Sequence, residues 1–413
     1  MRWGISMKYA VRSLARHMRR TFLSVFGIGL GVGVCLFMVS FVRGEGDMIM
    51  RAASESGTGH LRAVPKEWPA VRENDMRLQD WNGLRKTLQQ VEGIDVVTPR
   101  ARTEALLAFG TRVTGVEMVG VDPETEPRTN RLVRDVTEGR YLKPGDNEVT
   151  VVGAAVADRL DVEVGDPLMV TVAGSDGQMR SAMLDIVGLV SIGSRDLEAT
   201  ICQVQLAEVA KLTGLEGAGE LTMTAQDPDL IPELKQRIAG KLPESAVVMT
   251  WDEIRPELAA GLEVDKTWTR LMVGIIVLTV FLGIASAQLA AVLERRREFA
   301  VLSALGMKHG PLVRVMFTEG FFLGLIGGLL GLVFGVPAAY YISVWGIDFT
   351  AIYGQSEVAF SNILIDPVLY GDFGWWLVPL AMVLSLTATV LSSLYPAWFA
   401  ARTDPASALR VDQ

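Results

Sequence analysis

Residues 21–42 read TFLSVFGIGLGVGVCLFMVSFV, a run of 22 residues without an Asp, Glu, Lys or Arg. A helix of about 20 apolar residues spans the hydrocarbon core of a bilayer. Three further charge-free runs, of 23, 27 and 29 residues, lie at 271–293, 321–347 and 373–401. Four such runs exclude a soluble enzyme and a disordered chain, and they predict an integral membrane protein.

The first run has a rival interpretation as a cleaved signal peptide. The apolar part of a signal peptide is about 7–15 residues long and ends at a site of small residues. The run here is longer, and Phe41-Val42 is followed by Arg43-Gly44. We therefore expect it to remain in the protein as a membrane anchor.

Charge is distributed unevenly around the runs. Residues 1–20 carry six basic residues and no acidic one, and 294–314 carry five basic and two acidic residues. Residues 43–266 carry 25 basic and 38 acidic residues, and 348–372 carry four acidic residues and no basic one. Cytoplasmic loops of membrane proteins are enriched in Lys and Arg. We therefore expect both termini and 294–314 inside, and the two acidic segments outside.

The sequence thus predicts an α-helical membrane protein with four transmembrane helices (1+3) and a large α+β extracytoplasmic domain inserted between helices one and two. The predicted parts are a cytoplasmic amphipathic helix (1–20), transmembrane helix 1 (21–42), the extracytoplasmic domain (43–266), transmembrane helix 2 (267–293), a cytoplasmic helix (294–312), transmembrane helix 3 (313–347), an outer loop (348–372), transmembrane helix 4 (373–399) and a cytoplasmic tail (400–413).

The extracytoplasmic domain shows mixed α and β patterns. The expected strands lie at 60–64, 168–172, 183–190 and 246–250, with several short strands over 94–121, and the expected helices lie at 80–91 and 232–242. Gly174-Ser175-Asp176-Gly177 separates two of these strands, which indicates a β-hairpin. We expect residues 126–219 to form a second lobe, inserted into a first one.

The first 20 residues are amphipathic when drawn as a helix. One face carries Trp3, Met7, Val11, Leu14 and Met18, and the other carries Arg12, Arg16, Arg19 and Arg20. This pattern favours a helix that lies on the inner leaflet, with its basic groups at anionic headgroups. The alternative is ordinary flanking charge on the cytoplasmic side.

Glycine is concentrated in two of the runs. The first run contains the GxxxG pairs Gly27/Gly31 and Gly29/Gly33, and the third contains Gly320, Gly324, Gly327, Gly328, Gly331 and Gly335. Small residues allow membrane helices to approach closely, so we predict helix packing at Gly320, Gly324, Gly327 and Gly331. Contacts within the chain and contacts between subunits fit this pattern equally well.

The link between the second and third runs has the sequence ERRREFAVLSALGM over residues 294–307. Its charged start leads into a helical stretch with Phe299, Leu302, Leu305 and Met307 available for contact. Apolar side chains on a short cytoplasmic helix call for a protein partner. A helix lying on the inner leaflet fits the pattern about as well.

Signatures of catalysis are absent from the sequence. It contains no GxxxxGK[ST] phosphate loop, no HExxH and no GxSxG. The two cysteines, Cys35 and Cys202, exclude a disulfide scaffold, and we expect Cys202 to be a buried or half-buried free thiol. We therefore expect no catalytic residue, cofactor or metal site in this chain.

Several stretches together resemble one known family. They are residues 19–33, 151–157, 164–166, 294–307, 317–320, 395–398 and 400–410. The chain is similar along its whole length to the permease subunits of ABC transporters of the MacB, lipoprotein-releasing and FtsX type. These permeases reside in the bacterial inner membrane, so the resemblance implies a periplasmic domain and cytoplasmic termini.

The resemblance also implies partners and a coupling site. Two permeases, identical or related, pair in the membrane, and a separate ATPase dimer that binds ATP and Mg docks on their coupling helices. The family's coupling helix corresponds here to residues that include Arg297, Glu298, Phe299, Leu302, Leu305, Gly306 and Met307. Nucleotide-driven closure then works the outer domain, a mode called mechanotransmission.

Within the family, the sequence looks most like the lipoprotein-releasing permeases. The features are Ser56-Gly57-Thr58-Gly59-His60 just after the first run, a length near 400 residues and no fused ATPase. The implied substrate is a lipoprotein or another amphipathic molecule in the outer leaflet. Phe37, Met38 and Phe41 are candidates for an acyl-chain entry, although they also suit contact with lipid or with another helix.

Three other functions remain as alternatives. The first is export of a small molecule or peptide with a separate ATPase and a periplasmic adaptor. The second is substrate-free signalling to a cell-wall hydrolase, and the 224 residues of 43–266 are more than such members of the family usually have outside. The third is a membrane receptor without an ATPase, which residues 294–307 disfavour.

Overall fold

The computed structural model describes residues 18–192, 194–294, 309–350, 358–360, 363–396 and 398. The chain divides into two compact units. We call the first, which contains most of the apolar helices, the helical unit. We call the second, Asp47–Gly261 with Asp348–Val368, the outer domain. Residues 1–17 and 399–413, which hold most of the predicted N-terminal helix and the predicted tail, lie outside the described residues.

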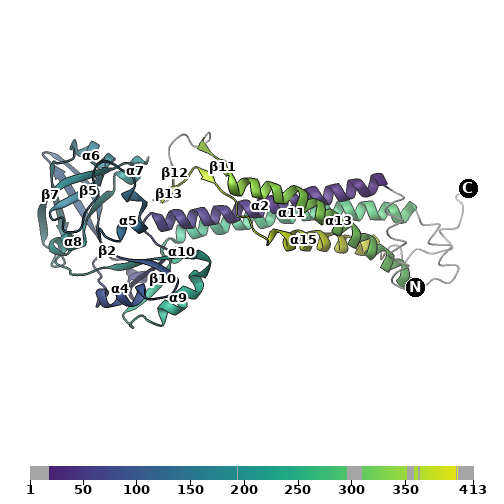
Figure 1. Ribbon diagram of the computed structural model, residues 1–413, viewed down its shortest axis with the longest axis horizontal. Helices are drawn as coiled ribbons and strands as arrows, with labels where there is room; N and C mark the ends of the chain where they lie inside the picture. Colours follow the sequence, from purple (N-terminus) through teal and green to yellow (C-terminus); the bar gives the residue numbers. More distant parts are fainter. Residues whose placement is uncertain are drawn as a thin grey trace, which may run out of the picture. The chain divides into compact units, whose positions relative to one another are not determined.

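Among the described residues, four helices are long and apolar enough to cross a membrane. They are α2 (Met18–Glu55), α11 (Pro256–Glu294), α13 (His309–Val344) and α15 (Leu377–Ser392). Within the helical unit these helices run side by side (Figure 1). Their shared core contains Ile28, Val32, Leu36, Ile284, Leu323, Ala339, Leu377 and Ala381.

Two of these helices are longer than the apolar runs that predicted them. We placed the end of the first span at 42 and the start of the second at 267, whereas α2 continues to Glu55 and α11 begins at Pro256. The end of an apolar run marks where hydropathy changes. The residues beyond are still good helix formers such as Met, Arg, Ala and Glu, so the backbone remains helical.

The outer domain is built on one mixed sheet of ten strands, in the order β10-β1-β9-β2-β3-β8-β5-β7-β4, with β6 paired to β2 and β7. The strands are β1 (Leu61–Pro65), β2 (Ile94–Phe109), β3 (Arg112–Val121), β4 (Val136–Gly139), β5 (Val149–Gly153), β6 (Pro167–Ala173), β7 (Met179–Val190), β8 (Ile201–Gln205), β9 (Glu220–Ala225) and β10 (Ala246–Thr250). The pairs β3/β8 and β5/β7 are parallel, and the other pairs are antiparallel. The predicted hairpin at 174–177 is confirmed by β6 and β7.

Short helices and turns complete the outer domain. They are α3 (Trp68–Val71), α4 (Trp81–Gln89), α5 (Glu126–Thr129), η1 (Arg131–Val133), α6 (Ala154–Leu160), α7 (Arg195–Glu198), α8 (Leu206–Thr213), η2 (Pro228–Leu230), α9 (Ile231–Ala239) and α10 (Trp251–Ile254). Two small strand pairs follow α13, namely β11 (Ile347–Asp348) with β14 (Val368–Leu369), and β12 (Val358–Phe360) with β13 (Ile363–Ile365).

The prediction of several short strands over 94–121 is wrong, because this stretch forms only the two long strands β2 and β3. Pro99 lies just before their shared ladder, which starts with Arg100 opposite Val121, so this ladder needs no N–H from the proline. Gly120 lies under α8, where a Cβ would come within 2.6 Å of Val209. That glycine therefore permits close helix packing and does not mark a turn.

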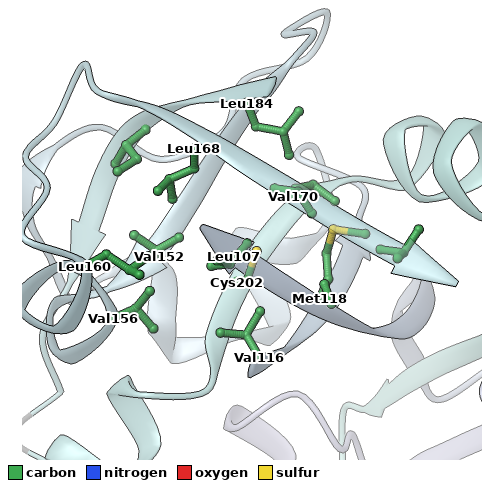
Figure 2. Packing of buried hydrophobic residues seen from close by; sticks show 14 of the residues in the cluster. Leu107, Val116, Met118, Val152, Val156, Leu160, Leu168, Val170, Leu184 and Cys202 are labelled. Carbon is green, nitrogen blue, oxygen red and sulfur yellow. The ribbon is translucent and has the colours of Figure 1, made fainter. Parts of the chain in front are cut away.

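Two hydrophobic cores lie along β2. One contains Leu61, Val97, Leu221, Leu234 and Val248, and the other contains Leu107, Met118, Val156, Leu184 and Cys202. Figure 2 shows side chains of the second core converging on one interior. This core already includes Ala101, so the division between the cores crosses β2. The inserted lobe expected at 126–219 stays a prediction. Cys202 is a buried free thiol, as we predicted.

His60 precedes β1 and is buried in the outer domain. Its side chain is buried, and its Nδ1 accepts a hydrogen bond of 3.0 Å from the backbone N–H of Ala225. Burial lowers the pKa of His60 below its ordinary value. Between that lowered pKa and the value near 6.5 of a histidine in the unfolded chain, the unfolded chain binds more protons than the folded chain. The stability of the domain therefore rises with pH over this range.

We therefore expect the outer domain to lose stability as the pH falls below about 6.5. In His60→Asn, Oδ1 is bonded to Cγ as Nδ1 is and can accept the same hydrogen bond without titrating. The slope of stability against pH should therefore become shallower. Thermal unfolding followed between pH 7.5 and 5.5 measures both slopes. Equal slopes in the two proteins would contradict this assignment.

Candidate functional site

Helix α13 presents one row of glycines to α15. Gly320, Gly324 and Gly328 recur every four residues. A Cβ at the first two would lie 2.2 Å from Ser393 Oγ and 2.3 Å from Thr389 Oγ1. Real Cβ atoms are not found so close to other atoms, so a larger residue at either position would require the Ser393 or Thr389 side chain to rotate or the helices to separate.

A second row on α13 faces α2. A Cβ at Gly327 or Gly331 would lie 2.5 Å from Ile28 or 2.6 Å from Val32, and Gly335 repeats the arrangement one turn later. Helix α13 therefore lies between two close neighbours of the same chain. The sequence pattern gave the glycines but did not separate the two faces on which they lie.

The glycines of α2 divide in the same way. A Cβ at Gly29 would lie 2.9 Å from Leu330 of α13, whereas one at Gly31 would lie 2.7 Å from Val280 of α11. A Cβ at Gly33 would also face α13, at 3.1 Å from Phe334, whereas one at Gly27 would meet no neighbour within 4 Å among the described residues. Within the part of the chain that the structure describes, Gly31 is therefore a packing position and Gly27 is not.

Small polar residues of α15 complete this packing. Ser385 Oγ donates a hydrogen bond to the carbonyl of Gly324, and Gln288 Nε2 of α11 donates one of 3.0 Å to Ser393 Oγ. Polar groups in a bilayer need such partners because water is excluded. These residues were not predicted from the sequence, although Ser385, Thr389 and Ser393 recur at steps of four within a charge-free run.

A short segment after β14 binds α2 near Ser40. The Asp372 N–H donates to the Ser40 carbonyl at 2.9 Å, and Ser40 Oγ donates back to the Asp372 carbonyl at 2.6 Å. Arg43 lies 3.5 Å from the Asp372 carboxylate and 4.2 Å from the centre of the Trp376 ring. These contacts tie α2 to the start of α15 by a route that does not depend on glycine packing.

The predicted acyl-entry residues lie on α2 in the same region. Phe37, Met38 and Phe41 are half-buried. The rings of Phe37 and Phe41 stack one turn apart, with centroids 6.4 Å from each other. Their partial exposure leaves them available to a lipid chain, and their role remains a prediction.

The predicted coupling residues lie outside the described residues. Helix α11 ends at Glu294 and α13 begins at His309. The residues concerned are Arg297, Glu298, Phe299, Leu302, Leu305, Gly306 and Met307.

The outer domain contains a polar cavity of about 400 Å³. Its lining includes the charged residues Glu55, Arg62, Arg72, Arg100, Arg102, Glu117, Glu126, Arg131, Arg255 and Glu257. Of these lining residues, Arg62 at 2.7 Å and Arg102 at 3.2 Å donate hydrogen bonds to the buried Glu220, while Arg100 pairs with Glu126 at 2.9 Å. Sequence reasoning did not find this cluster because its members come from β1, β2, β9 and α5.

The pKa values reflect how strongly these charges are coupled. Burial lowers the pKa of Arg62 to about 10, and Glu220 opposes this while Arg102 and Arg100 add to it. Burial alone would raise the pKa of Glu220, but Arg62 and Arg102 outweigh it and keep that pKa below its ordinary value. Among the described residues, no group of three or more His, Cys, Asp or Glu side chains has the arrangement of a metal site.

Comparison with known proteins agrees with this architecture. Residues 21–241, more than half of the chain, match the family profile of the MacB-like periplasmic core domain, and residues 270–405 match the FtsX-like permease C-terminal domain. The chain belongs to the MacB/FtsX family of ABC transporter permeases. The FtsX-like part of this permease contains α13, α15 and most of α11. Its described residues contain the four predicted apolar helices, and its periplasmic domain, predicted as α+β, is built on a mixed sheet.

The relatives of this permease include lipoprotein-releasing proteins. It is 26% identical over 412 residues to the lipoprotein-releasing system transmembrane protein LolC of Neisseria meningitidis serogroup B, covering 95% of this chain and 94% of that one. It is 24% identical to LolE of Haemophilus influenzae, covering 94% and 93%. It is also 23% identical to the macrolide export ATP-binding/permease protein MacB of a Shewanella species, covering 99% and 60%.

Proposed function

We propose that this permease releases lipoproteins from the outer leaflet of an inner membrane. The observation that carries the proposal is the similarity to LolC over 95% of the chain. The tightly packed contacts of α13 with α2 and α15 support it, because movement of one helix in such a bundle must displace the others. Phe37, Met38 and Phe41 then provide the lateral entry for an acyl chain.

The energetics require a machine driven by ATP. Each buried methylene contributes about 0.8 kcal/mol to membrane anchoring. A lipid anchor with two or three acyl chains is therefore held by tens of kcal/mol, so unaided release is negligible. In the proposal, a partner ATPase dimer binds ATP and Mg²⁺, and a second permease, identical or related, completes the transporter.

The proposal also orients the chain. Both termini and residues 294–312 face the cytoplasm, where the ATPase docks on the coupling helix, and the outer domain lies in the periplasm. The basic residues of 1–20 and 294–314 support this orientation.

A substitution in the coupling helix tests the ATPase contact. We expect Leu302→Asp or Leu305→Asp to weaken docking of the ATPase at least about tenfold, which corresponds to about 1.4 kcal/mol, because a charge replaces an apolar contact. Ser303→Asp adds the same charge at a polar position and is the matched control. Co-purification with titrated ATPase measures the effect. Unchanged docking of both leucine variants would refute the coupling-helix assignment.

The substrate is tested by purification and release. The protein, isolated in mild detergent, is analysed by mass spectrometry of what remains bound, and the complex is then reconstituted into vesicles that carry an acylated lipoprotein. ATP-dependent release, with lipoproteins and an ATPase bound, would support the proposal. A bound adaptor without lipoprotein release would favour export, as the similarity to MacB suggests, and a bound wall hydrolase would favour signalling. Reproducible absence of an ATPase would refute the transporter assignment.

A further inference from the structure

The segment Ser56-Gly57-Thr58-Gly59-His60 joins the end of α2 to β1. Gly57 and Gly59 have φ angles of +88° and +71°, a backbone region that favours glycine. Ser56 forms an isolated β-bridge with Asn130. The chain therefore turns sharply as it leaves α2, and the turn contacts a segment more than 70 residues away.

A buried ion pair holds this turn. Arg100 Nε and Nη2 donate to the two carboxylate oxygens of Glu126, each at 2.9 Å, and the side chains are 1% and 0% exposed. The remaining nitrogen, Nη1, donates to the carbonyl of Gly57. Asn130 Nδ2 adds a hydrogen bond of 2.7 Å to Glu126. The guanidinium is thus fixed by the carboxylate and directed at the turn.

The residues that form this contact come from distant parts of the outer domain. Arg100 lies in β2, the strand along which the two hydrophobic cores lie, and Glu126 begins α5. Gly57 follows α2, which is one continuous helix from Met18 to Glu55. The Arg100–Gly57 contact therefore connects the end of α2 to the centre of the sheet.

Stability does not by itself explain a buried ion pair here. Apolar side chains of similar size usually serve a domain core as well or better, because two charges must be removed from water. An apolar pair at 100 and 126 would, however, remove the Arg100 donor and leave the Gly57 carbonyl with the longer hydrogen bond of 3.5 Å from Arg62 Nη2. The feature that the ion pair adds is this directed hydrogen bond.

We propose that Arg100, oriented by Glu126, is a positioning residue that transmits movement of α2 to the outer domain by holding the Gly57 carbonyl. The inference rests on the proposed function, in which ATP-driven movement of the membrane helices works the outer domain. We call the Arg100–Glu126 pair with its hydrogen bond to the Gly57 carbonyl the clasp, because it holds the end of α2 to the sheet. Without the clasp, a movement of α2 displaces the outer domain less.

The test uses a variant that removes the clasp and keeps the core filled. Arg100→Met together with Glu126→Leu replaces the ion pair by two apolar side chains. The matched control is Arg195→Met with Asp158→Leu, which removes an ion pair of 2.6 Å whose side chains are 78% and 65% exposed. Equal thermal stability of variant and control verifies folding. If the double variant is not folded, Arg100→Lys, which keeps the charge but loses the planar fork, takes its place.

A distance measurement tests the clasp without relying on function. Spin labels at the exposed positions Arg51 of α2 and Lys86 of α4 report the distance between the helix end and the domain in the full-length protein in detergent. We expect a narrow distribution in the native protein and the control, and a broad one in the clasp variant. A distribution that stays narrow in the clasp variant would overturn the proposal, whether or not the protein releases lipoproteins.

Coupling is then measured in vesicles that contain the permease, its ATPase and an acylated lipoprotein. We expect the ratio of lipoprotein released to ATP hydrolysed to fall about fivefold in the clasp variant, the factor contributed by one typical hydrogen bond. The rate of ATP hydrolysis should remain unchanged. An unchanged ratio would overturn the proposal. Absence of release by the native protein would instead refute the proposed function, and the distance measurement would still decide on the clasp.

Discussion

Glu126→Leu is expected to destabilise the outer domain by about 3–5 kcal/mol, because it leaves the Arg100 guanidinium charged and buried without its carboxylate. Arg100 is 1% exposed, so its guanidinium is removed from bulk water and depends on the carboxylate as its charged partner. The loss also removes the acceptor of the Asn130 amide. Unfolding of the full-length protein in urea, followed by tryptophan fluorescence, measures the change.

The positive charge of Arg100 explains why we expect Glu126→Leu alone to be so destabilising. Adding Arg100→Met to Glu126→Leu should restore most of the lost stability, because no charge then remains buried. Asp158→Leu is the control, since it breaks the exposed pair with Arg195 and should change stability by less than about 1 kcal/mol. If Glu126→Leu were no more destabilising than Asp158→Leu, the buried pair would contribute nothing specific.

Local features of the fold could be predicted from the sequence because they depend on neighbouring residues. The charge-free runs gave the four apolar helices, and Gly174-Ser175-Asp176-Gly177 gave the β6–β7 hairpin. The same reasoning failed at Pro99 and Gly120, where a residue that often breaks a strand is tolerated because of what lies beside it. Pro99 lies just outside the β2–β3 ladder, although it pairs with Leu221 in the β2–β9 ladder, and Gly120 lies under a helix.

Contacts between distant residues could not be predicted in this way. Gly57, Arg100 and Glu126 meet only because β2 and α5 bring them together, and no spacing in the sequence signals that. The glycines of α13 are an intermediate case. Their steps of four predicted close packing, but only the structure separates the row that faces α15 from the row that faces α2.

We expect the second large effect from Gly331→Leu. This substitution should lower the free energy of unfolding by about 3 kcal/mol, at the upper end of the range for overpacking a tight interface. A Cβ at this position would lie 2.6 Å from Val32 and 3.3 Å from the carbonyl of Gly29. Side chains can rotate away, but the backbone oxygen cannot, so α2 and α13 must separate. Because α13 also packs against α15, the separation would disturb the whole bundle.

Gly27→Leu provides the matched control, because it adds the same side chain to α2 at a glycine where a Cβ would meet none of the described residues within 4 Å. In detergent, we expect the melting temperature of Gly27→Leu to be close to that of the native protein and the melting temperature of Gly331→Leu to be well below it. Equal losses would mean that leucine is poorly tolerated anywhere in these helices, and would contradict a specific role for the α2–α13 contact. A loss confined to Gly331→Leu would show that close approach of these helices holds the bundle together, since hydrophobic burial offers helices little advantage over lipid in a bilayer.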